Sequence, residues 1–106
     1  MALTRDFKTN VEARVQRDPK FRKALLREAI DSMIAGDVDS GKAVLRDYIN
    51  ATIGFPQLAA AVDIPSKSLM RMLAPAGNPT ASNFFEIVAL LQRREGVRLR
   101  VRSVAA

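Results

Sequence analysis

Residues 55–73, FPQLAAAVDIPSKSLMRML, are the most informative stretch of the sequence, because they predict two short helices separated by a tight turn. Ala59 is small enough to let the second helix approach the first. Asp63 stands where the chain must turn with a positive φ, a conformation that Asp tolerates better than most residues. Pro65 stands where Ser or Thr usually caps the second helix. The pattern allows two solutions: Pro65 lies in the first helical turn, or Ser66 caps the helix one residue later.

The apolar residues of this stretch form a wedge between the two helices. Leu58, Val62, Ile64 and Leu69 fall on the facing sides, which leaves the outer face of residues 66–71 free. This arrangement is typical of a helix-turn-helix, whose second helix enters a major groove of DNA. Plain helical bundles also contain two short helices around an alanine-rich turn, so this second interpretation remains open.

The composition of the chain limits its class. A length of 106 residues predicts one domain with a single core. The sequence contains no Cys and no His, which removes the thiol nucleophile, the imidazole base and most zinc ligands. The remaining carboxylates, Lys and Ser show no catalytic spacing. We therefore expect no enzyme activity, no metal site and no cofactor.

The N-terminus, MALTRDFKTN, becomes polar within four residues, and the sequence has no apolar run of transmembrane length. We therefore expect a cytoplasmic protein without a signal peptide or a membrane anchor.

The net charge of +6 and the isoelectric point near 10.5 indicate an acidic partner. Residues 64–106 contain seven basic and two acidic residues, a net charge of +5, whereas residues 1–63 contain ten and nine, a net charge of +1. The basic half begins at the second helix of the quoted stretch, as expected if that half faces phosphates. A solvated basic surface is the alternative, and charge alone does not distinguish DNA from RNA or an acidic protein.

Hydrophobic periodicity and turn residues predict an all-α domain of five to six helices, followed by a short C-terminal strand. Residues 1–18 form an N-terminal extension with a first helix from Thr4 to about Arg17. Residues 19–96 form the helical domain and residues 97–106 a strand and tail. In the extension, one narrow stripe is apolar: Phe7, Val11 and Val15.

Caps and glycines set the expected helix ends. Asp18 and Pro19 start the second helix and Gly36 ends it. Either Asp37 or Asp39 caps a third helix, which runs to about Thr52 before Gly54. Either Thr80 or Ser82 caps the sixth helix, which Gly96 ends. Four residues of the sixth helix share one apolar face: Phe84, Ile87, Val88 and Leu91.

After Gly96 the pattern changes to strict alternation, which predicts a strand. Val97, Leu99 and Val101 alternate with Arg98, Arg100 and Arg102. The sequence contains no second strand, so we expect this strand to pair with its counterpart in a second copy, with its apolar side on the core. A disordered basic tail is the alternative.

Residues 20–102, in this order of elements, resemble the antitoxin (antidote) proteins of bacterial toxin–antitoxin modules, a branch of the Cro/lambda-repressor-like helix-turn-helix superfamily. The resemblance is clearest in SLMRML at residues 68–73 and GNPT at residues 77–80. Asp63 and Pro65 depart from the family pattern, in which Gly and a hydroxyl cap are common. The resemblance implies a homodimeric repressor that binds its own operator in double-stranded DNA and neutralises a cognate toxin.

The same resemblance implies which residues contact DNA. On the two helices of the motif they are Gln57, Ser66, Lys67, Ser68, Met70 and Arg71. Lys67 is suited to donate to guanine, and Arg71 to phosphate or guanine. Asn78, Thr80 and Asn83 add candidate phosphate contacts at the N-terminus of the sixth helix, although Thr80 and Asn83 fit better as caps.

Two other functions fit the sequence. A stand-alone regulator would keep DNA binding without a toxin, and the neighbouring gene distinguishes it from an antitoxin. A protein-interaction module would not bind DNA at all, and would show no salt-dependent affinity for duplex DNA.

Overall fold

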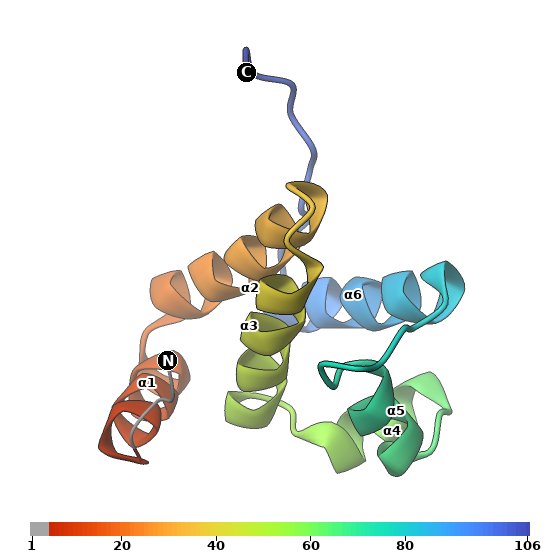
Figure 1. Cartoon of the computed structure of the whole chain (residues 1–106). Coiled ribbons are helices and arrows are strands. Elements are labelled where there is room, and N and C mark those ends of the chain that lie inside the picture. Colours follow the sequence, from red (N-terminus) through yellow and green to blue (C-terminus); the bar gives the residue numbers. More distant parts are fainter. Residues whose placement is uncertain (1–4) are drawn as a thin grey trace.

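The computed structural model describes residues 5–106, with the side chains of residues 10–106. The chain is helical over most of this range, and no strand occurs in it. Thr4 and the side chain of Phe7, both expected in the first helix, lie outside the described part. Six helices follow one another (Figure 1): α1 (Arg5–Arg17), α2 (Pro19–Ile34), α3 (Val38–Ala51), α4 (Phe55–Val62), α5 (Ser66–Met72) and α6 (Ala81–Glu95).

Helices α2 and α3 form the most extensive helix pair of the domain. Asp18 caps α2 by accepting from the Phe21 amide at 3.2 Å, and this hydrogen bond lowers the pKa of the Asp18 carboxyl. Asp37 caps α3 by accepting from the Ser40 amide at 3.3 Å. These caps agree with the sequence prediction, and Asp37 rather than Asp39 is the residue used.

Helix α3 crosses α2 at Gly41, where a side chain would not fit. A Cβ on Gly41 would overlap the Met33 side chain and come within 2.8 Å of the Ala29 carbonyl oxygen. Gly41 therefore sets the distance between the two helices.

Helix α1 packs against α2 and α3. Val15 is fully buried, and the Arg14 guanidinium lies 4.3 Å from the centre of the Phe21 ring. Val11, on the same predicted stripe, is only half-buried.

One hydrophobic core joins α2 to α6. Each of these five helices contributes at least one fully buried side chain, and the loop after α5 contributes one more. These side chains are Leu26, Leu45, Ile49, Leu58, Leu69, Leu73, Ile87 and Leu91. The predicted apolar face of α6 is confirmed at Ile87, Val88 and Leu91, and Phe84 is half-buried. Thr80 caps α6 and Gly96 ends it in the left-handed conformation, at φ 70°.

Residues 97–106 do not form the predicted strand. They leave the end of α6 as an extended segment, called the arm below, which projects from the body of the molecule (Figure 1). Val97 and Leu99 are half-buried, but Val101, expected on the core, is 78% exposed. Residues 5–106 supply no second strand, and the Leu99 amide donates instead to Gln92 Oε1 at 2.7 Å.

Among residues 5–106, no helix is both long enough and apolar enough to cross a membrane.

Candidate nucleic-acid interface

Helices α4 and α5 are joined by the tight turn that the sequence predicts. Asp63 adopts the left-handed conformation, with φ 56° and ψ 46°, and it is the only non-glycine residue with positive φ in the described chain. The Ala59 carbonyl accepts from the amides of both Asp63 and Ile64, which closes the end of α4. The direction of α5 therefore depends on one strained residue.

The start of α5 differs from both predicted solutions. Pro65 itself occupies the N-cap position, with φ −56° and ψ 140°, and no side chain caps the helix. The Pro65 carbonyl accepts from the Leu69 amide at 3.0 Å, and Ser66 is the first helical residue. Proline tolerates this position because its backbone needs no N–H partner there.

The predicted wedge is confirmed by burial. Leu58 and Leu69 are fully buried, Val62 and Ala59 are each 8% exposed, and Ile64 packs half-buried against the core. This burial fixes the rotation of α5 about its own axis.

The opposite face of α5 is open to solvent. Lys67, Met70 and Arg71 are exposed, and Met70 keeps 53% of its surface, while Ser66 and Ser68 are half-buried at the flanks. Positions 70 and 71 lie three and four residues after position 67, about one helical turn, so the three side chains share this face. The face thus carries two cationic side chains and one flexible apolar side chain.

The other predicted contact residues lie outside α5. Gln57 is exposed in the first turn of α4, and Asn78 is exposed in the loop between α5 and α6. Thr80 is the N-cap of α6, where its hydroxyl accepts from the Asn83 amide at 3.1 Å. The cap interpretation is therefore confirmed for Thr80, although its side chain stays exposed, and it is wrong for Asn83, which lies half-buried in the first turn of α6.

Lys42 on α3 holds the end of the α5 segment. Its side chain is 3% exposed, and Nζ donates to the carbonyls of Ala74, Pro75 and Gly77 at 3.2, 3.1 and 2.8 Å. Asp39 Oδ1 lies 3.8 Å from the same nitrogen. The ammonium group thus satisfies three carbonyls that follow a helix C-terminus, where the backbone has no intrahelical partners.

Two further residues complete this clamp. Arg46, one turn along α3, donates from Nη1 to the Leu73 carbonyl. A Cβ on Gly77 would overlap the carbonyl oxygens of Arg71 and Met72, so only glycine lets the loop fold back onto α5. Lys42, Arg46 and Gly77 together fix α5 relative to α3.

Sequence reasoning did not identify Lys42 and Arg46, and it assigned Gly77 only to a turn. A signal for Lys42 existed: it lies three and seven residues before Leu45 and Ile49, on the buried face of its helix. A cation on a buried face requires partners. The sequence does not say which partners they are.

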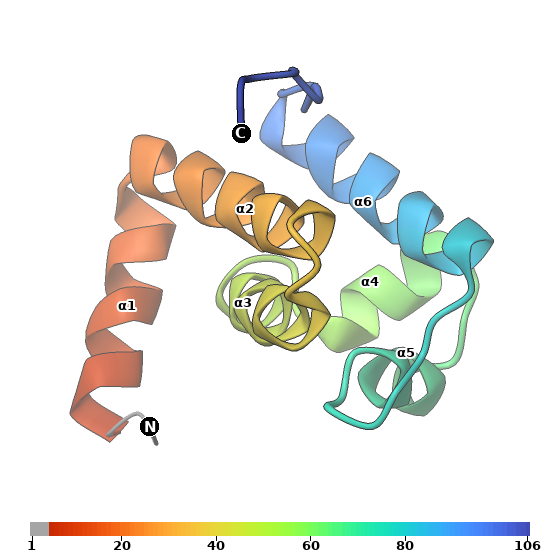
Figure 2. The same cartoon turned by 45° about the horizontal axis from the view of Figure 1, so that its top comes forward.

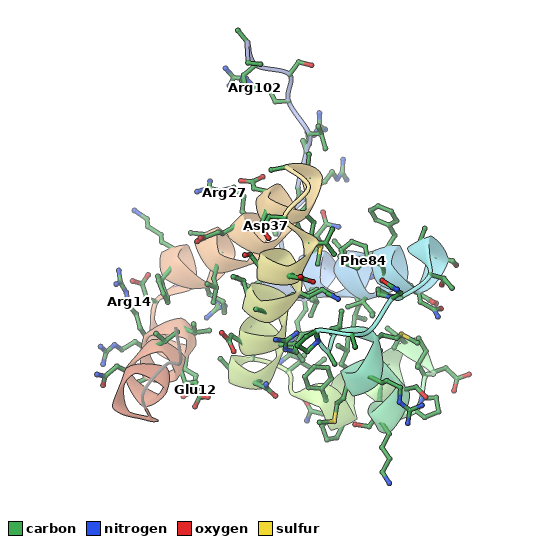
Figure 3. All side chains as sticks on the ribbon, in the orientation of Figure 1. Glu12, Arg14, Arg27, Asp37, Phe84 and Arg102 are labelled. Atoms are coloured by element: carbon green, nitrogen blue, oxygen red, sulfur yellow. The ribbon has the colours of Figure 1, made fainter. Side chains whose placement is uncertain are left out.

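The basic half of the chain does not form a single surface. Lys67 and Arg71 lie on α5, whereas Arg98, Arg100 and Arg102 lie on the arm. The arm and α5 occupy opposite ends of the molecule in both orientations (Figures 1 and 2), and Figure 3 labels Arg102 far from α5. The basic side chains of residues 64–106 therefore lie on at least two separate surfaces.

Comparison of the chain with protein families, with characterised proteins and with solved structures finds no match.

Proposed function

We propose that this protein is a sequence-specific DNA-binding transcriptional repressor that reads the major groove with the outer face of α5. The main support is the turn at Asp63, which presents Lys67, Met70 and Arg71 on a helix whose opposite side is buried. A helix so presented fits the width of a major groove. Arg71 and Lys67 supply the donors that guanine and phosphate accept.

The clamp at Lys42 also supports this function. Reading base edges requires a helix held in one orientation, and α5 is only seven residues long. Contacts from α3 to the four carbonyls after α5 supply the rigidity that so short a helix lacks on its own.

A homodimer completes this proposal. One helix of this size covers one half-site, and two copies place their recognition helices about 34 Å apart on one face of the duplex. Light scattering at micromolar concentration measures the mass. A monomer, both alone and on a palindromic duplex, would contradict the dimer.

The role as an antitoxin rests on the resemblance of residues 20–102 alone. A tagged copy of the chain should then purify with the product of the adjoining gene when both are expressed together. A stand-alone regulator would show DNA binding without this co-purification.

Binding to duplex DNA tests the main proposal. A pool of random duplex is titrated at several salt concentrations, and bound sequences are then selected from the pool. We expect salt-dependent affinity, and Lys67→Ala or Arg71→Ala should weaken binding to the selected sequence by about 1–3 kcal/mol for a base contact. A phosphate contact should instead reduce the salt slope by about one.

Lys23→Ala is the matched control, because Lys23 is an exposed lysine on α2. It should leave the affinity for the selected sequence unchanged. Full affinity in both α5 variants, or affinity without salt dependence, would overturn the proposed interface.

A further inference from the structure

Ile34 and Phe85 are large apolar side chains that remain exposed beside the arm. They are 58% and 65% exposed, and Phe85 contacts Phe84 edge to face, with ring centres 5.3 Å apart. Val101 on the arm is 78% exposed. Isolated exposed apolar residues are common on protein surfaces, but a contiguous group is typical of a binding surface.

These residues line one groove between α2, α6 and the arm. Its volume is about 840 Å³, and its apolar lining includes Ile30, Ile34, Phe84, Phe85, Leu99 and Val101. The walls are two long helices, and the third side is the extended arm (Figure 2). An apolar groove between helices is the usual seat of an amphipathic helix from another protein.

The charges around the groove are mostly of one sign. Four guanidinium groups line it, against the single carboxylate of Asp31: Arg27, Arg98, Arg100 and Arg102. Figure 3 labels Arg27 on α2 and Arg102 on the arm, both on the side of the molecule away from α5. The structure thus combines an apolar floor with a basic border.

We propose that this groove is the docking site for an acidic amphipathic helix of a partner protein. The apolar side of such a helix would cover Ile34 and Phe85, and its carboxylates would pair with the arginines at the border. The arm would close over the bound helix. The apolar residues of the arm, such as Val101, would then be covered by that helix.

A second copy of the chain and duplex DNA both fit this surface less well than an acidic helix. A second copy docked groove to groove about a two-fold axis would bring two sets of four guanidiniums together. Duplex DNA would pair with the arginines but would leave the phenylalanine and isoleucine side chains against a polar backbone. An acidic amphipathic helix would cover the apolar floor of the groove and pair with the arginines at its border.

This docking site does not depend on DNA binding, because α5 lies at the other end of the molecule. The probe is a fluorescent helical peptide with leucines at positions i, i+3, i+4 and i+7 and glutamates elsewhere. The control peptide replaces each glutamate by lysine. Fluorescence anisotropy with the full chain should show at least about tenfold tighter binding of the acidic peptide.

Phe85→Ser and Ile34→Ser test the floor of the groove. Both side chains are exposed, so the variants should melt like the parent and yet bind the acidic peptide at least about tenfold more weakly. Met70→Ser is the control, since Met70 is similarly exposed on α5. It should leave peptide binding unchanged.

Each of the other outcomes would overturn the docking site. Equal binding of the two peptides removes the role of charge, and full peptide affinity in both groove variants removes the groove. A dimer that Phe85→Ser converts to a monomer assigns the groove to a second copy. Loss of duplex affinity in Phe85→Ser assigns it to DNA, whereas failure of DNA binding by the parent leaves the peptide result unaffected.

Discussion

Whether a side chain of α5 is buried or exposed depends on which side of this short helix it occupies. Leu69 and Met70 are neighbours on α5, yet the first is fully buried and the second is 53% exposed. Asp63 sets this difference, because its left-handed turn fixes how α5 leaves α4. One residue of rotation would exchange the buried and the exposed side chains.

Leu69→Ala should lower the free energy of unfolding by about 2–5 kcal/mol, because it leaves a cavity in the core. Met70→Ala is the matched control and should change it by less than about 0.5 kcal/mol. Urea unfolding of the two variants measures the difference. Equal stability of both variants would show that α5 is rotated differently from this structure.

At the scale of elements, the main feature is the attachment of α5 to α3. The packing of α4 against α5 comes from residues that are close in sequence, but the clamp joins Lys42 to carbonyls 32 to 35 residues away. The buried ammonium group is stable there because three carbonyl oxygens accept hydrogen bonds from it.

Lys42→Met keeps the aliphatic stem and removes the ammonium, so the three carbonyls lose their common donor. The free energy of unfolding should fall by about 1.5–3 kcal/mol, and amides in and after α5 should exchange hydrogen faster. Lys23→Met, at an exposed lysine of α2, should change neither. If amide exchange around α5 is the same in both variants, the clamp does not hold this helix.

At the scale of the whole molecule, four helices meet at Glu95. Glu95 Oε1 accepts from Tyr48 Oη and from Arg22 Nε, each at 2.5 Å, and Arg22 Nη1 donates to the Val15 carbonyl at 3.1 Å. These contacts join the ends of α1 and α6 to α2 and α3. Burial raises the pKa of the Tyr48 hydroxyl far above its usual value of 10.0, and the hydrogen bond to Glu95 raises it further.

The chain has one tyrosine, so its ultraviolet titration reports this junction directly. The native protein should titrate at a higher pH than the protein unfolded in guanidinium, whose tyrosine ionises near 10. Because the folded state holds the proton more tightly, its stability should be constant below about pH 10 and fall as the pH rises above it. Glu95→Gln should lower the native pKa, and identical titrations of native and unfolded protein would contradict the buried hydrogen bond.

Most of the helical architecture follows from local sequence patterns. The caps at Asp18 and Asp37, the turn at Asp63 and the ends at Gly36 and Gly96 depend on interactions within a few residues. The buried faces follow from periodicity, because a helix with one apolar side must cover it. The wedge between α4 and α5 was predictable for the same reason.

Contacts between groups that are distant in sequence depend on how the whole chain packs. The partners of Lys42 and the close approach at Gly77 depend on how the loop folds back onto α5. The hydrogen bond between Tyr48 and Glu95 depends on where the end of α6 lies relative to α3. The strand predicted from the alternation in the arm does not form, because a strand requires a second strand to pair with and residues 5–106 contain none. The residue pattern within a helix or turn specifies its local conformation. Which other segments it contacts depends on the packing of the whole chain.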